Sequence, residues 1–256
     1  MSNDNGQISV KPKITSIAQL VHNEEFVKKA QDVLGSGTQQ FMSSVLSLNN
    51  ANPELQKVDP IRLYNCCLMA AALKLPFNQN LGHAYIIAYK GEPQLQIGWK
   101  GFVQLAQRSG MFKTIGVTAV RENEIAGIDP MTGEIIFDFK LKKEGEVVGY
   151  MAYFRLLNGF EKNLYMTIEE LKQHAKRYSQ TFQRGTGVWV DNFEAMAQKT
   201  VIKLLLSRYA PLSVDMQRAI EIDQANDQGD YVDNRPRVEL ADATLGSDEN
   251  GDGGQS

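Results

Sequence analysis

Apolar residues recur at helical spacing through the first 75 residues of the chain. This period predicts two helices, over residues 15–34 and 37–50, with a break at Gly35-Ser36-Gly37. Asp59-Pro60 then supplies an N-cap and a first-turn proline for a third helix, IRLYNCCLMAAALKL. That segment is apolar on most faces, so we expect a buried helix that ends before Pro76.

The middle of the chain changes to the alternating pattern of strands. AYIIAYK and PQLQIGW predict a hairpin with its turn at residues 91–93, followed by a short helix over residues 100–109 that Gly110 closes. Strand character returns in FKTIGVTAVR, IIFDFKL, EVVGYMAYFRL and NLYMT. These runs predict one antiparallel sheet.

Helical spacing resumes near residue 167. Thr167 and Glu170 have the spacing of a capping box and open a helix to about Tyr178. The loop SQTFQRGTG follows, then a long helix over residues 188–209, which Pro211 ends, and a shorter helix into the mid 220s. We therefore predict an α+β fold over residues 15–226, between a flexible leader (residues 1–14) and a disordered tail (residues 227–256) poor in large apolar residues.

Charge separates the tail from the body. Residues 221–256 hold ten acids against Arg235 and Arg237, whereas residues 1–220 hold 25 bases and 20 acids. A basic body favours an anionic ligand, and an acidic tail is either a solubilising segment or one that competes with that ligand or recruits a partner.

The sequence lacks the motifs that nucleotide-triphosphate-binding and zinc-binding proteins require. The sequence contains no G-x-x-x-x-G-K-[ST] loop for a nucleotide triphosphate, and His22, His83 and His174 are scattered without metal-ligand spacing. No cofactor or metal is therefore expected. Cys66 and Cys67 are adjacent in an apolar run, which suits reduced thiols in a cytoplasmic protein. Neither a signal peptide nor a membrane-spanning run is present, so we expect a soluble protein.

One pattern resembles the carboxylates of a metal-dependent nuclease. Asp129, Asp138 and Lys140 could hold a divalent ion and position a water molecule. However, IIFDFKL places Ile135, Phe137, Phe139 and Leu141 on one strand face and leaves Asp138 and Lys140 toward solvent. Asp129-Pro130 is also typical of a turn. A structural role is therefore favoured over a nuclease site.

Two segments concentrate bases. Residues 97–121 hold Lys100, Arg108, Lys113 and Arg121, no acid, and the aromatic residues Trp99, Phe102 and Phe112. Such residues can neutralise phosphates and stack on bases, although core packing is the commoner fate of the aromatic rings. Because this segment lacks acids, we expect its bases to be unpaired.

The second basic segment is residues 172–208. Lys172 and Lys176 share one helix face, as do Lys199 and Lys203. In the long helix, residues at core spacing form a stripe: Trp189, Phe193, Met196, Thr200 and Leu204. Lys199 and Lys203 should lie beside this stripe, within reach of a backbone phosphate. The two segments together suggest an anion-binding groove.

The same segments carry a family resemblance. GWKGFVQLA followed by Arg108-Ser109-Gly110 looks like the motif of RecT-type annealing proteins, and Trp189, Phe193, Met196, Lys199 and Thr200 are similar to that family's W-x-x-x-F-x-x-M-x-x-K-T segment. The stretch NQNLGHAYIIAY also fits. The resemblance covers about residues 15–215 and implies an antiparallel, β-hairpin-rich sheet packed against a long helix.

The resemblance implies a function that needs no catalytic residue. Members of this family bind single-stranded DNA without ATP, form rings or helical filaments, and anneal complementary strands through a duplex intermediate, usually beside a phage exonuclease. A partner exonuclease and the single-strand-binding protein of a bacterial host are the expected protein partners. A passive single-strand binder is the remaining alternative. The expected DNA-binding residues are Trp99, Lys100, Arg108, Lys113, Arg121, Lys172, Lys176, Arg177, Arg184, Gln198, Lys199, Lys203 and Arg208.

Overall fold

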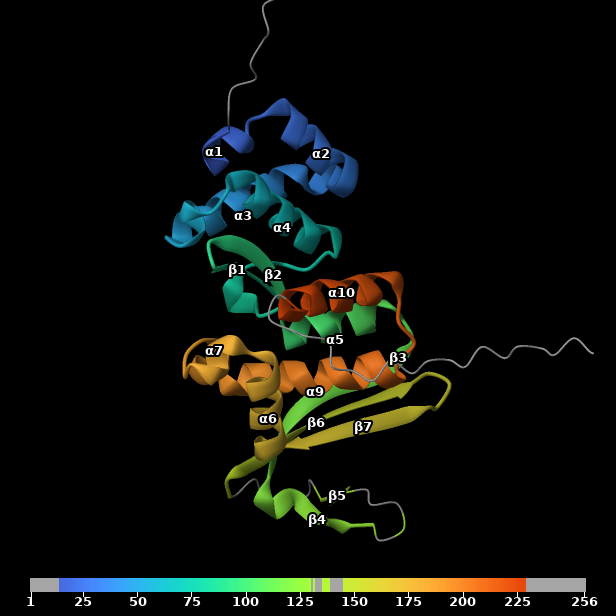
Figure 1. The fold of residues 1–256 in the computed structure, drawn as a ribbon. Helices are drawn as coiled ribbons and strands as arrows, with labels where there is room; N and C mark the ends of the chain where they lie inside the picture. The colour runs from blue at the N-terminus through green and yellow to red at the C-terminus, as the bar shows by residue number, and fades with distance from the viewer. Residues whose placement is uncertain (1–13, 130, 132–134, 139–144, 229–256) are drawn as a thin grey trace, which may run out of the picture.

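Helical and sheet layers alternate along the long axis of the molecule (Figure 1). The structure, a computed structural model, describes residues 14–129, 131, 135–138 and 145–228. Its helices and antiparallel strands confirm the predicted α+β class. The predicted leader, apart from Ile14, and nearly all of the predicted acidic tail lie outside the described residues.

Four helices form the N-terminal layer: α1 (Ile17–Leu20), α2 (Glu24–Leu34), α3 (Thr38–Ala51) and α4 (Pro60–Ala72). The predicted first helix is thus two, because Asn23 caps a new helix by accepting from the backbone N–H of Glu25. The predicted break at Gly35–Gly37 is confirmed: α2 ends at Leu34, these three residues form a 3-10 turn, η1, and α3 begins at Thr38. Asp59 caps α4 as predicted, but α4 ends before Lys74, which has the positive φ of 52°.

A hairpin and a helix follow α4. Strands β1 (Ala84–Tyr89) and β2 (Glu92–Ile97) pair in antiparallel register, with Tyr89 opposite Glu92. The turn therefore lies at Lys90 and Gly91 and not at the predicted residues 91–93, because Glu92 and Pro93 already pair within β2. Both turn residues have positive φ, as a two-residue hairpin loop requires. Helix α5 (Trp99–Arg108) lies close to its predicted boundaries, and Gly110, which follows the C-cap Ser109, has the positive φ of 71° expected just after a helix end.

The strands divide among separate sheets rather than forming the one sheet predicted. Within the described residues, β3 (Phe112–Arg121), β6 (Val147–Leu156) and β7 (Glu161–Thr167) form a three-stranded antiparallel sheet with β6 in the centre. Among the strands of the described part of the chain, β4 (Ile125–Ile128) and β5 (Ile135–Phe137) pair only with each other, as do β1 and β2.

The C-terminal helices begin with α6 (Ile168–Tyr178), where both hydrogen bonds of the predicted capping box form. The predicted loop contains a short helix, α7 (Gln180–Gln183). The predicted long helix is divided into α8 (Val188–Asp191) and α9 (Phe193–Tyr209), because the Asn192 side chain accepts from the Ala195 N–H and starts a new helix. Helix α10 (Val214–Gln228) follows Pro211.

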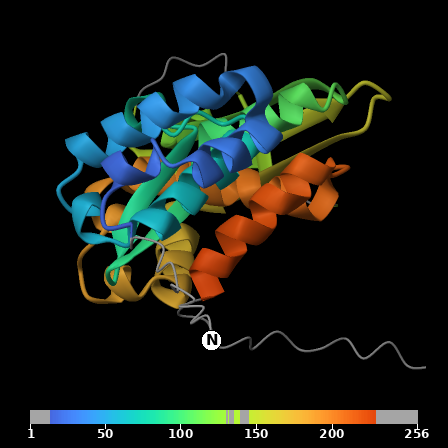
Figure 2. The same cartoon turned by 90° about the horizontal axis from the view of Figure 1, so that it is seen from above.

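Helix α9 lies at the centre of the molecule. It packs against β6, β7 and β3 on one side and against α5 on the other, where α10 also contacts α5 (Figure 1). Seen from above, the N-terminal helices cover much of the molecule and α10 lies beside them (Figure 2). Because α9 is enclosed, its buried positions surround the helix instead of forming one stripe: Ala197, Lys199, Thr200, Val201, Ile202, Leu205 and Leu206.

Candidate nucleic-acid interface

The glycines of the GWKGF segment allow α5 to start against the backbone that enters β1. The Gly98 N–H donates to the His83 carbonyl at 2.9 Å. A Cβ atom at Gly98 would collide with the Gly82 carbonyl oxygen, and one at Gly101 would collide with the His83 carbonyl oxygen. The motif therefore fixes the first turn of α5, which carries Trp99, against the loop before β1.

Lys100 extends from this fixed turn. Its side chain is exposed, and its Nζ lies 5.7 Å from the centroid of the Trp99 ring, which is half-buried and packs on the core. Burial, followed by the charge of Lys100, lowers the pKa of His83. Lys100 thus places a positive charge where α5 meets the loop before β1. The Trp99 ring packs on the core, and the Lys100 ammonium group lies over its face.

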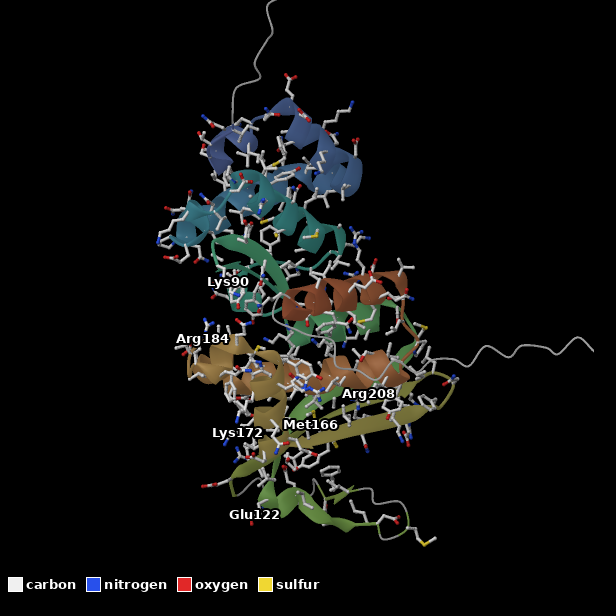
Figure 3. The ribbon with its side chains drawn as sticks, viewed as in Figure 1. Lys90, Glu122, Met166, Lys172, Arg184 and Arg208 are labelled. Carbon is white, nitrogen blue, oxygen red and sulfur yellow. The ribbon has the colours of Figure 1, made fainter. Side chains whose placement is uncertain are left out.

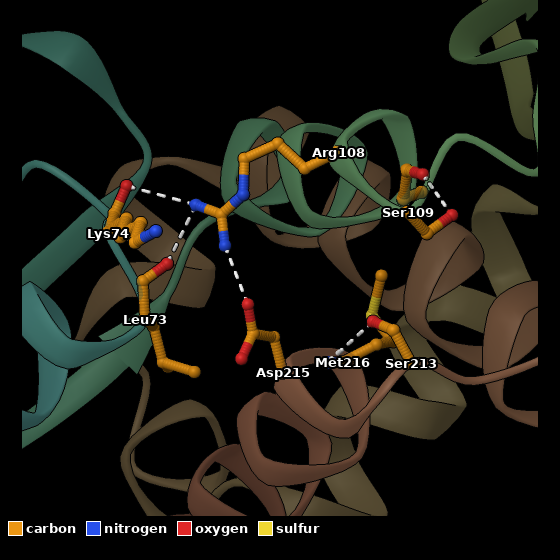
Figure 4. Close-up of polar contacts among 8 residues, drawn as sticks. Leu73, Lys74, Arg108, Ser109, Ser213, Asp215 and Met216 are labelled. Atoms are coloured by element: carbon orange, nitrogen blue, oxygen red, sulfur yellow. Dashed lines mark hydrogen bonds and ion pairs between the residues drawn. The ribbon is translucent and has the colours of Figure 1, made fainter.

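Arg108 is held by contacts within the protein, contrary to the expectation that the bases of this segment are unpaired. Its guanidinium donates to the carbonyls of Leu73 at 2.8 Å and Lys74 at 3.2 Å (Figure 4). It also forms an ion pair with Asp215 of α10 at 2.9 Å. Arg108 therefore joins the ends of α4, α5 and α10.

Arg121 also has an internal role, whereas Lys113 is exposed. The half-buried Arg121 side chain donates to the Gly145 carbonyl at 2.7 Å, and its backbone N–H donates to Glu124 at 2.8 Å. Lys113 lies at the start of β3 and makes no ion pair with a described residue. Of the four bases in residues 97–121, Lys100 and Lys113 are thus the ones available to a ligand.

Helices α6 and α7 present a second group of cations. Lys172, Lys176, Arg177 and Arg184 are all exposed, and none forms an ion pair with a described residue. Lys172 and Lys176 are four residues apart and share a face, as predicted. Arg184 follows α7, and Figure 3 shows it on the same edge of the molecule as Lys172 and Lys90.

His174 marks the place where α6 and α9 bring cations together. Its ring lies 4.5 Å from that of Tyr178 and 6.3 Å from that of Trp189. Burial lowers the pKa of His174 to about 4, assisted by the charges of Lys203, Arg177 and Arg208. His174 is therefore neutral at physiological pH, and the exposed Arg177 and Arg208 belong to one positive region.

Lys199 and Lys203 lie inside the molecule rather than along the surface of α9. Lys199 Nζ is 2.6 Å from Asp223 Oδ1, and Lys203 Nζ is 2.8 Å from Asp223 Oδ2. Burial alone would raise the pKa of Asp223, but the two lysines outweigh it and hold that pKa below its usual value. The adjacent Gln198 is half-buried and donates to Glu194 at 3.3 Å.

The structure thus brings together only part of the predicted groove. The charges of Arg177, Arg208 and Lys203 all lower the pKa of His174, while Arg108 and Arg121 serve the fold. Sequence reasoning missed Asp223 and His174. The signal for Asp223 was its place in the buried stripe of α10, after Met216, Ala219 and Ile220, where a charge requires a partner.

The residues of the nuclease alternative are only partly described. Asp129 accepts from the backbone N–H of Met131 at 2.7 Å, consistent with the predicted turn, and Asp138 is half-buried beside β5. Lys140 lies outside the described residues. Within the described part of the chain, no group of three acidic, histidine or cysteine side chains is placed to hold a metal ion. No described helix combines the length and apolar character needed to cross a membrane.

Comparisons with known proteins give one family. The RecT family model matches residues 39–239. An uncharacterised protein of Bacillus subtilis strain 168, YqaK, is 37% identical over 237 residues, which cover 92% of this chain and 82% of the relative. Protein RecT of Escherichia coli K12 is 28% identical over 217 residues, covering 76% of each chain.

Proposed function

The chain belongs to the RecT family, and on this premise we propose that it binds single-stranded DNA and anneals complementary strands in phage-type homologous recombination. The observation that carries the proposal is the group of exposed cations on α6, after α7 and at the end of α9: Lys172, Lys176, Arg177, Arg184 and Arg208. Cations without carboxylate partners can neutralise successive phosphates whatever the base sequence.

Annealing needs no bond to be made or broken in the DNA backbone. The protein has to neutralise the charge of one strand and leave its base edges accessible to a second strand. We propose that it does so without ATP or another cofactor, as the family resemblance implies, and as a ring or filament in which neighbouring protomers extend the cationic surface. The proposed single-strand contacts are the exposed cations, including Lys100 and Lys113.

The test combines binding and annealing with matched variants. Lys172→Ala/Lys176→Ala removes two charges from α6, and Lys28→Ala/Lys29→Ala removes two exposed charges from α2, neither of them ion-paired with a described residue. If each α6 lysine contacts one phosphate, the first variant flattens the slope of log affinity against log salt by about 1.4. The control should leave that slope unchanged.

The annealing arm separates the alternatives. Annealing of complementary fluorescent oligonucleotides should proceed at the same rate with and without ATP. Binding without faster annealing would indicate a passive single-strand binder, and magnesium-dependent loss of the strands would indicate a nuclease. Equal salt slopes for both double variants would show that α6 is not part of the interface.

A further inference from the structure

Three charged side chains contact one another: Lys199 and Lys203 of α9 and the buried Asp223 of α10. The side chains of Lys199, Lys203 and Asp223 are exposed by 9%, 13% and 1%, respectively. One carboxylate oxygen contacts each ammonium group, at 2.6 Å and 2.8 Å. The cluster therefore keeps one net positive charge, although Asp223 is in contact with both lysines.

Asp223 offsets the charges of two enclosed lysines, but stability alone does not explain a cluster of three charges at this position. Asp223 continues the buried stripe of α10 after Met216, Ala219 and Ile220, where an apolar side chain would also pack. Burying ions costs solvation free energy, and apolar replacements of buried ion clusters are often as stable or more so. A charge retained here points to a role for the charge itself.

The carboxylate of Asp223 matches the chemistry of a DNA phosphodiester. Both groups carry one negative charge, and both offer two oxygen atoms that can accept from two ammonium groups. Exchange of one for the other would leave the charge of the cluster unchanged. The strand would therefore pair with two ammonium groups that Asp223 of α10 neutralises in this structure.

We propose that Lys199 and Lys203 form a phosphodiester-binding site, which Asp223 occupies until single-stranded DNA displaces α10. This inference rests on the proposed single-strand binding. It adds a specific phosphate site and a helix, α10, that blocks the site in the absence of DNA. Residues 210–213, between α9 and α10, form neither helix nor strand, so they can act as a hinge. Displacement would also separate α10 from β2 and α5, expose Met216, Ala219 and Ile220, and break the Arg108–Asp215 ion pair, in which Asp215 is 52% exposed.

The site adjoins the exposed cations of the proposed interface. Lys203 and Arg208 lie five residues apart on α9, and their charges act together with that of Arg177 of α6 on His174. A strand that contacts Arg177 and Arg208 would therefore pass close to Lys203. The buried lysines would bind the phosphate adjoining those exposed contacts.

The first experiment measures the affinity of full-length variants for single-stranded oligothymidylate. Asp223→Asn keeps the shape of the side chain but removes the competing charge, and it should bind about tenfold tighter, at the low end of coupling between close charge pairs. Glu221→Gln removes the same charge from an exposed position of α10 and should stay within about twofold of the parent protein. Equal or weaker binding by folded Asp223→Asn would overturn the proposal.

The second experiment uses the unchanged protein, so it remains decisive if Asp223→Asn does not fold. Hydrogen exchange is compared with and without oligothymidylate. We expect faster exchange at the backbone amides of α10 in the presence of the strand. Unchanged or slower exchange in α10, with binding evident elsewhere, would overturn the proposal alone, whereas absence of any binding would overturn the proposed function as well.

Discussion

Gly98 and Gly101 of the family motif are required by close packing of the backbone. Each faces a carbonyl oxygen of the loop before β1, at a distance that leaves no room for a side chain. The spacing of the two glycines in GWKGF therefore reflects the approach of α5 to residues 82 and 83. Lys100, between them, is the exposed charge that this packing positions.

We predict that Gly101→Ala destabilises the protein by about 2 kcal/mol, because the new methyl group must move the backbone at His83. Gly116→Ala is the matched control, since no atom lies within 4 Å of a Cβ placed there. Urea unfolding of both variants measures the difference. A Gly101→Ala protein as stable as the Gly116→Ala protein would contradict the close approach.

His174 gives a pH-dependent prediction at the same scale. Its pKa in the folded protein is lowered to about 4, so the unfolded chain binds a proton at this residue at higher pH than the folded protein does. Its contribution to stability is complete above the unfolded pKa of about 6.5 and is lost as the pH falls from there toward 4.

We expect His174→Phe, which keeps an aromatic ring beside Tyr178, to remove part of this acid sensitivity. Between about pH 7 and pH 4, the parent protein should lose on the order of 2–3 kcal/mol more unfolding free energy than the variant. Denaturant unfolding at both pH values measures this difference. Parallel losses would show that His174 titrates alike in the folded and unfolded states.

At the scale of elements, local signals were sufficient for several boundaries. Asp59 and the pair Thr167 and Glu170 act within one helical turn, and the structure shows their predicted caps. Gly110 is equally local, but the β1–β2 turn lies at Lys90 and Gly91 rather than at the predicted residues 91–93, because Glu92 and Pro93 pair within β2. Asn192 carried a comparable capping signal, but the continuous apolar spacing around it favoured one long helix over α8 and α9.

Contacts distant in sequence account for the wrong expectations. Arg108 lacked an acid in its own segment, yet its partner Asp215 lies 107 residues further on. Lys199 was expected at the surface because no sequence pattern shows that Asp223 of α10 pairs with it. The partition of strands among sheets also depends on pairing across long separations. The sequence was therefore informative about caps and turns, and less so about which side of a buried helix meets solvent.

At the scale of the whole molecule, charge is divided along the chain. Residues 229–256 hold seven acids and two bases, so they contribute five negative charges to a net charge of −3. The remaining chain is therefore positive by two. The exposed cations of α6 and α9 belong to that positive part. Any strand that approaches them meets a field that the C-terminal residues reduce.

We predict that deleting residues 229–256 tightens single-strand binding about three- to tenfold at low salt, because removal of five negative charges strengthens long-range attraction. The gain should disappear as salt approaches physiological strength, where the screening length falls to about 8 Å. Deletion after Gln228 keeps α10 and Asp223, so the buried lysine cluster is unchanged. Annealing of purified strands should persist.

A full-length variant in which the seven acids of residues 229–256 become Asn or Gln separates charge from chain length. If charge alone is responsible, this variant binds like the truncated protein at every salt concentration. A gain limited to the truncated protein would mean that these residues obstruct the strand by occupying space. A truncated protein that unfolds or fails to anneal would place the segment within the annealing domain, and the proposed domain boundary at residue 226 would be wrong.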